Sequence, residues 1–146
     1  MVPILEQVLE KYPQDVKVVF KNFPLQNHKY AMKAAVAALA ADSQEKFWEF
    51  HDLLFENYNR LNDEKIQEIA KTVGLNLEEY EKMKKDPSTQ GRVKRDLADG
   101  RRAGVRGTPT VFINGKRLRD RSLQGFQDDI NKQLEKLGKK TAKPAS

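Results

Sequence analysis

The sequence predicts an α/β fold, in which helices cover a small β-sheet. An apolar run over residues 16–23 predicts one strand. A second region, residues 110–118, contains Asn114–Gly115 between short apolar or β-prone segments, which is the strongest short signal for a β-hairpin. Between these two regions, apolar residues recur at helical spacing, so we expect a long helical crossover.

The first two elements follow from their apolar patterns. A helix is expected over residues 3–12, because Ile4, Val8 and Tyr12 recur at helical spacing on one face. Residues 16–23 are expected to form the first strand. Their mostly apolar composition suits a strand that is covered on both faces.

Four or five helices are expected in the crossover. Asp42 followed by Glu45, and Asn76 followed by Glu79, have the spacing of a capping box at a helix N-terminus. An Ala-rich segment before Asp42 permits close helix packing. We expect these helices over residues 29–41, 43–60 and 63–73, over a short segment after Asn76, and over residues 88–103.

The pattern changes in the C-terminal part. Thr110–Ile113 and Lys116–Leu118 are expected to pair as a hairpin around Asn114–Gly115. A last helix is expected over residues 122–138, and the polar segment 139–146 is expected to be a disordered tail.

The composition excludes several kinds of site. The chain has 38% hydrophobic and 33% charged residues, which is typical of a globular domain. It contains no cysteine, so disulfides, thiolate nucleophiles and Cys-ligated metals are excluded within these 146 residues. His28 and His51 are too far apart for a helical ligand pair, and we expect neither a metal nor a cofactor. We expect no membrane span and find no signal-peptide pattern at the N-terminus, so the compartment is left open.

The net charge of +6 is unevenly distributed, with basic residues concentrated between Arg92 and Arg121. Acidic residues are interleaved among them, which favours a solvated helix face followed by a charged hairpin. A nucleic-acid footprint is the less favoured alternative.

The segment Gly104–Gly115, with sequence GVRGTPTVFING, is the most informative motif. Pro109 opens a predicted strand, and the Thr108–Pro109 bond is a candidate for the cis form because cis is cheap only before proline. A trans proline that merely starts the strand is the alternative. The segment closely resembles the cis-proline strand of the DsbA-type thiol-disulfide oxidoreductases, which have a thioredoxin fold.

Further blocks extend the resemblance to roughly residues 2–138. They are Val2–Tyr12, which resembles the family helix that begins with Cys-x-x-Cys, and the segments around Phe23–Leu25 with His28 and around Lys46–Phe55. The resemblance implies one thioredoxin-like domain over residues 1–138 with an all-helical insertion at about 28–104. It also implies dithiol-disulfide exchange on protein substrates, in a family that is largely periplasmic or extracytoplasmic.

The chain departs from the family pattern at its beginning. In the family, Cys-Pro-x-Cys lies a few residues before the position of Pro3 and follows a central strand, and this sequence contains neither. We therefore expect an N-terminally truncated member that lacks the N-terminal strand and the Cys-x-x-Cys, has no catalytic residue and is redox-inactive as given. A sheet without its central strand also predicts a homo-oligomer, with exchange of elements as one route.

The resemblance assigns the remaining site residues. In the family, the residue before the cis-proline pairs through its backbone with an extended substrate, so Thr108, with Gly107 and Pro109, is predicted to bind substrate. His28 matches a position near the active-site face, with an exposed or helix-capping histidine as the alternative. His51 is expected in the core, and Trp48 between helices.

Three functional hypotheses follow. The first is an oxidoreductase-family chain that lacks its N-terminal strand and Cys-x-x-Cys. The second is a non-catalytic module that binds extended peptides near Thr108–Pro109. The third is nucleic-acid binding through Arg92–Arg121, which predicts a steep salt dependence.

Overall fold

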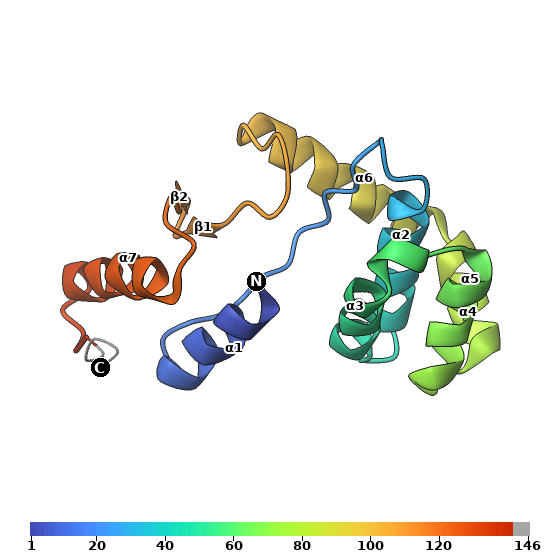
Figure 1. The fold of residues 1–146 in the computed structure, drawn as a ribbon, viewed down its shortest axis with the longest axis horizontal. Helices are drawn as coiled ribbons and strands as arrows, with labels where there is room; N and C mark the ends of the chain where they lie inside the picture. Colours follow the sequence, from blue (N-terminus) through green and yellow to red (C-terminus); the bar gives the residue numbers. More distant parts are fainter. Residues whose placement is uncertain (142–146) are drawn as a thin grey trace. The chain divides into compact units, whose positions relative to one another are not determined.

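A computed structural model describes residues 1–141 of the chain. The described part is rich in helix and contains one short hairpin (Figure 1). The elements are α1 (Val2–Lys11), α2 (Ala31–Asp42), α3 (Phe47–Glu56), a short 3-10 turn (Tyr58–Arg60), α4 (Asp63–Thr72), α5 (Leu77–Lys85), α6 (Pro87–Arg102), β1 (Phe112–Ile113), β2 (Lys116–Arg117) and α7 (Leu123–Lys136).

The chain divides into two compact units. The hairpin unit comprises Met1–Phe20 and Gly107–Ser146, and the helical unit comprises Lys21–Arg106. The bounds of the helical unit are close to those predicted for the insertion, about 28–104. That the whole of residues 1–138 acts as one domain stays a prediction, and the predicted tail beyond residue 141 lies outside the described residues.

In the hairpin unit, α1 and α7 pack against each other and against the base of the hairpin. The Tyr12 hydroxyl at the end of α1 donates a hydrogen bond of 2.9 Å to the Asn131 side chain of α7. The buried core residues are Val8, Tyr12, Leu118, Phe126, Ile130 and Leu134. The apolar faces predicted for the first and last helices are therefore the faces that meet.

The predicted hairpin is confirmed. β1 and β2 are antiparallel, with Ile113 opposite Lys116, and the Leu118 N–H extends the pairing with a 2.9 Å bond to the Val111 carbonyl. Asn114 has φ of 47° and Gly115 has φ of 79°, the left-handed pair that a type I′ turn requires.

The strand predicted over residues 16–23 is wrong. Within residues 1–141, the only sheet pairs β1 with β2, and residues 16–25 form no ladder. A strand exists only through pairing with a neighbour. Only the two ends of the segment are packed: Val16 contacts the hairpin-unit core, and Asn22 and Phe23 contact α6, while Val19 and Phe20 are exposed.

In the helical unit, α2 contacts each of the helices α3 to α6. Five of its alanines are buried, and small side chains let these helices approach closely. The core around α2 is closed by larger residues: Phe50, Leu54, Ile66, Ile69, Leu75 and Tyr80.

Local caps explain where these helices begin. The Asn76 side chain accepts a 3.0 Å bond from the Glu79 N–H, which confirms the N-cap predicted for α5. Asp86 caps α6 by accepting a 2.7 Å bond from the Ser88 N–H, so α6 begins at Pro87. The capping box predicted at Asp42 is wrong, because Asp42 continues α2 and forms an ion pair of 3.1 Å with Arg92 instead.

A buried carboxylate fixes the entry to the helical unit. Asp96 of α6 is 7% exposed and accepts 2.9 Å hydrogen bonds from both the backbone N–H and the side-chain amide of Asn22. Lys21 lies 3.3 Å from the same carboxylate. Burial raises the pKa of Asp96, but the bonds from Asn22 and Lys21 outweigh it, so the pKa lies below its usual value. The adjacent Phe23 ring leaves no space at Gly100, where a Cβ would come within 2.7 Å.

Candidate functional site: the Thr108–Pro109 loop

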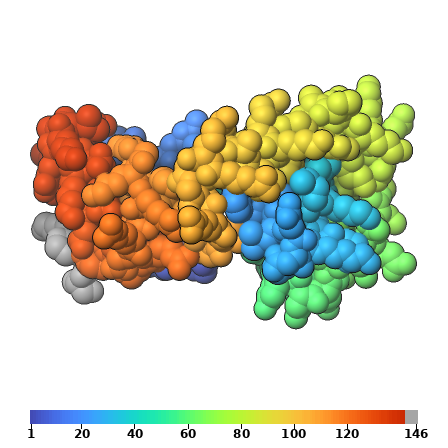
Figure 2. All heavy atoms as spheres, turned by 90° about the horizontal axis from the view of Figure 1, so that it is seen from above, coloured from blue at the N-terminus to red at the C-terminus, as the bar shows by residue number. Residues whose placement is uncertain are grey.

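The loop between α6 and the hairpin contains the predicted substrate-binding residues. Gly107, Thr108 and Pro109 are consecutive in the hairpin unit, and the Thr108–Pro109 peptide bond is cis. Thr108 and Pro109 are exposed. In the space-filling view, the orange segment that contains this loop and the hairpin lies open at the surface (Figure 2).

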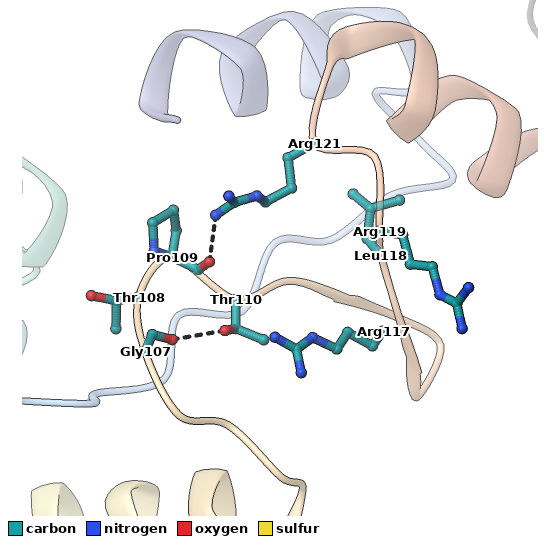
Figure 3. A pocket seen from close by; sticks show the side chains of 8 residues that line it. All are labelled: Gly107, Thr108, Pro109, Thr110, Arg117, Leu118, Arg119 and Arg121. Atoms are coloured by element: carbon teal, nitrogen blue, oxygen red, sulfur yellow. Dashed lines mark hydrogen bonds between the residues drawn. The ribbon is translucent and has the colours of Figure 1, made fainter.

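The three residues line an open pocket of about 620 Å³. Its other walls come from Thr110 and from the segment that begins with the last residue of β2 (Figure 3). That segment contributes Arg117, Leu118, Arg119 and Arg121.

Two side chains hold the loop in shape. The Thr110 hydroxyl donates a 2.7 Å hydrogen bond to the Gly107 carbonyl. The Arg121 guanidinium donates a 2.7 Å bond to the Pro109 carbonyl, and both bonds are drawn in Figure 3. The carbonyls on either side of Thr108 are therefore occupied.

Thr108 itself is left open. Within residues 1–141, neither its backbone N–H nor its carbonyl has a hydrogen-bond partner in the protein. Buried backbone groups are nearly always paired, but these groups are exposed and available to a partner. The loop thus leaves the backbone N–H and carbonyl of Thr108 free for pairing, while the carbonyls of Gly107 and Pro109 are held by side chains.

The wall that carries Arg121 is fixed to the start of α7. Ser122 caps the helix by accepting a 3.1 Å bond from the Gly125 N–H. Asp120 accepts a 2.9 Å bond from the Ser122 N–H, and this bond holds the pKa of Asp120 below its usual value. Gly125 packs against the Asp120 backbone so closely that a Cβ would overlap the Asp120 carbonyl oxygen.

The other two sequence-predicted residues lie in the helical unit. His28 is exposed in the turn before α2, where its N–H donates to the Leu25 carbonyl and its carbonyl accepts from the Ala31 N–H. Its role as an active-site neighbour stays a prediction. His51 is 5% exposed, as expected for a core histidine, with Nδ1 3.0 Å from an Asp52 carboxylate oxygen.

The inter-helix packing predicted for Trp48 stays a prediction. Trp48 is 47% exposed. Its indole meets the rings of Phe47 and His51, which belong to the same helix, at centroid distances of 5.1 and 5.4 Å.

The basic residues at the pocket are the feature that the sequence reasoning missed. Arg117, Arg119 and Arg121 were part of a general basic stripe, but their concentration over residues 117–121 is a signal of its own. A straight extended segment would place every second side chain on one face, but the chain bends at Arg119, so that Arg117 and Arg121 point toward the loop and Arg119 points away from it (Figure 3). Leu118 between them is 4% exposed and belongs to the core.

No group of three or more His, Asp or Glu side chains is arranged to hold a metal ion within residues 1–141. In the same range, no helix has the length and apolar character needed to cross a membrane.

Comparison with known proteins identifies the family. Residues 2–131 match the family described as the DSBA-like thioredoxin domain. The chain belongs to this family. The DSBA-like assignment confirms the thioredoxin-type fold class and the resemblance carried by the Gly104–Gly115 motif.

A solved structure agrees with the DSBA-like fold. The thiol-disulfide exchange protein alpha-DsbA2 from Wolbachia pipientis superposes with a TM-score of 0.76. The match covers 90% of this chain and 72% of that one, at 22% sequence identity.

The curated relatives are much longer proteins. The Na(+)/H(+) antiporter NhaA 3 of Salinispora tropica is 35% identical over 116 residues, which are 79% of this chain and 18% of the antiporter. The antiporter NhaA of Herminiimonas arsenicoxydans is 33% identical over 108 residues, or 74% of this chain and 17% of the relative. The chain therefore spans less than a fifth of the length of these relatives.

Proposed function

We propose that this DSBA-like chain binds polypeptides in an extended conformation at the Thr108–Pro109 loop, and that these 146 residues do so without exchanging disulfides. The observation that carries the proposal is that the backbone of Thr108 is unpaired. Its N–H and carbonyl have no partner among the described residues, while the Gly107 and Pro109 carbonyls are occupied by Thr110 and Arg121.

A residue with an unpaired backbone N–H and carbonyl favours a ligand that supplies backbone hydrogen bonds. When an extended peptide lies beside such a unit, its N–H and carbonyl groups supply the missing bonds, as in strand addition to a sheet edge. Each such bond contributes about 0.5–1.5 kcal/mol net. Because the two flanking carbonyls are already bonded, the register of a bound peptide is set at Thr108.

Disulfide exchange needs a sulfur that this chain lacks. The reaction proceeds by attack of a thiolate on a disulfide through a mixed-disulfide intermediate. The sequence contains no cysteine, so exchange would require a thiol from outside these 146 residues. We expect the isolated chain to show no insulin-reducing activity above a protein-free control.

Selective N-methylation of a peptide tests backbone pairing directly. A short, neutral, unstructured peptide is methylated at alternate amide nitrogens in one of two registers, and binding is measured by fluorescence anisotropy. Methylation in the pairing register should weaken binding about tenfold, the loss expected for one or two backbone bonds, whereas the other register should keep its affinity. Equal affinities for both methylated peptides, or no binding at millimolar peptide, would contradict the proposal.

The function named for the antiporter relatives is not proposed for this chain. This chain matches 18% of one antiporter and 17% of the other, so we do not propose ion transport for it.

Self-association is a second proposal, based on the hairpin. Within residues 1–141, β1 and β2 pair only with each other, so each strand has one edge without a neighbouring strand. Phe112 on β1 is 38% exposed, and an apolar edge of this kind favours pairing with a second copy. We expect a dimer or larger assembly by light scattering at tens of micromolar. A monomer at that concentration would refute it.

A further inference from the structure

The pocket beside the Thr108–Pro109 loop has a one-sided charge. Three of its eight lining residues are arginines, namely Arg117, Arg119 and Arg121, and none is acidic. All three belong to the short segment 117–121, which bends at Arg119, and the buried Leu118 anchors that segment in the hairpin-unit core. The backbone that carries these arginines is therefore held in place by the core.

The three arginines have no acidic partner within the part of the chain that the structure describes. Asp120, the acid nearest in sequence, is turned to the Ser122 backbone N–H. On α6, Arg92 pairs with Asp42 and Arg102 pairs with Asp99, whereas Lys94, Arg95 and Arg101 form no ion pair with a described acid. The basic stripe of the sequence thus divides into a partly neutralised portion on α6 and an unneutralised portion at the pocket.

Arg121 joins the wall to the loop. One of its N–H groups donates to the Pro109 carbonyl at 2.7 Å. A guanidinium has five N–H donors in a planar fork, so others are left for a ligand. In Figure 3, Arg121 and Arg117 reach toward the loop from opposite ends of the segment, and Arg119 extends outward between them.

We propose that this pocket selects acidic extended polypeptides, whose carboxylates pair with Arg117 and Arg121 while their backbone pairs with Thr108. The inference rests on the proposed function, because it names the class of polypeptide that the loop binds. Arg117 and Arg121 reach toward the loop from the two ends of the segment, so carboxylates on either side of the residue that pairs with Thr108 match the wall in charge and in position.

A polypeptide fits these observations better than a nucleic acid does. The open groups of Thr108 provide one donor and one acceptor, and the acceptor would face the phosphates of a nucleic acid without a partner. The unneutralised wall is also short, since it spans five residues.

Two matched peptides test the selection. One has Glu at alternate positions of an unstructured sequence, and the other has Gln at the same positions. We expect the Glu peptide to bind the full chain about tenfold more tightly at low salt, because charge-assisted pairs to arginine are stronger than neutral ones. The preference should shrink at about 0.15 M salt, where the screening length is about 8 Å.

Two double variants locate the preference. Arg117→Gln with Arg121→Gln should bring the ratio of Glu-peptide to Gln-peptide affinity close to one. Arg95→Gln with Arg101→Gln removes the same charge from the exposed surface of α6 and should leave that ratio at its original value. Circular dichroism of both variants checks that the helices are retained.

The outcomes separate this inference from the proposed function. If both peptides bind with equal affinity, acidic selection is wrong while extended-peptide binding stands. If neither peptide binds, both proposals fail. If the α6 variant loses the preference as much as the pocket variant, the wall is not the selecting feature. Tighter binding of a single-stranded oligonucleotide of equal charge than of the Glu peptide would also overturn the inference.

Discussion

The two compact units of this chain use their polar groups in different ways. In the helical unit, the buried Asp96 is bonded to Asn22, and exposed arginines such as Arg92 have acidic partners. In the hairpin unit, the Thr108 peptide unit and the arginines of the pocket wall have no protein partner within residues 1–141, apart from the bond of Arg121 to Pro109. Polar groups of the helical unit thus stabilise the fold, while those beside the loop remain available to a ligand.

The largest effect on stability is expected from Gly125→Ala, which disturbs the contact between α7 and Asp120 in the hairpin unit. The new methyl group would overlap the Asp120 carbonyl oxygen, so α7 and the segment before it must separate. We expect a loss of about 3 kcal/mol in the free energy of unfolding, at the upper end for an overpacked site. Urea unfolding measures it.

Gly91→Ala is the matched control in the helical unit. A Cβ at Gly91 of α6 would meet only the Arg95 guanidinium, at an ordinary 3.6 Å. Since alanine is the better helix former, we expect a gain of about 0.5–1 kcal/mol. Similar effects of the two alanines would show that the Asp120 contact does not hold the wall.

The next effect is expected from Asp96→Asn in the helical unit. The variant loses the charge that accepts both Asn22 bonds and faces Lys21, so we expect a loss of about 2 kcal/mol in unfolding free energy. Asp99→Asn is the control, because the Asp99 side chain is 44% exposed and its pairs should contribute less than about 1 kcal/mol.

The contribution of the Asp96 carboxylate should also appear in the pH dependence of the free energy of unfolding. Because the pKa of Asp96 is lower in the folded state, its contribution is present above the unfolded pKa of about 3.9 and is lost as the pH falls through the folded value. Asp96→Asn should therefore lose less stability than the parent chain when the pH is lowered below about 4. Parallel acid curves for the two proteins would contradict this account.

The smallest effect is expected from Tyr80→Phe, which tests the one exception to polar pairing found in the described helical unit. The Tyr80 hydroxyl is buried without a hydrogen-bond partner, and burial raises its pKa. Removing it should leave stability unchanged or increase it by about 1 kcal/mol, because an unpaired buried hydroxyl carries a desolvation cost. A loss above about 1 kcal/mol in thermal unfolding would indicate that the hydroxyl has a bound partner such as water.

The sequence predicted what local chemistry determines. The Asn114–Gly115 turn and the Asn76 cap follow from residues that are neighbours in the chain. The strand over residues 16–23 was wrong because a strand depends on a distant partner, and the Asp42 cap was wrong because the same residue type also fits inside an Ala-rich helix.

The site was only half predictable for the same reason. The Gly107–Pro109 loop was found through its motif, but the open peptide unit of Thr108 depends on bonds that only a three-dimensional arrangement reveals. The bond from Arg121 to the Pro109 carbonyl joins residues twelve positions apart and has no local signal. The concentration of arginines over residues 117–121 was visible in the sequence, but the direction of each side chain depends on the bend at Arg119.

The central claim is that an extended polypeptide binds at the Thr108–Pro109 loop, and mapping backbone amides tests it most directly. The isotope-labelled chain is titrated with a neutral, unstructured peptide, and the shifts of its amide resonances are followed by NMR. We predict that the largest shifts occur at Thr108 and Thr110, with little change in α2–α5. Shifts confined to the helical unit, or none at saturating peptide, would contradict the claim.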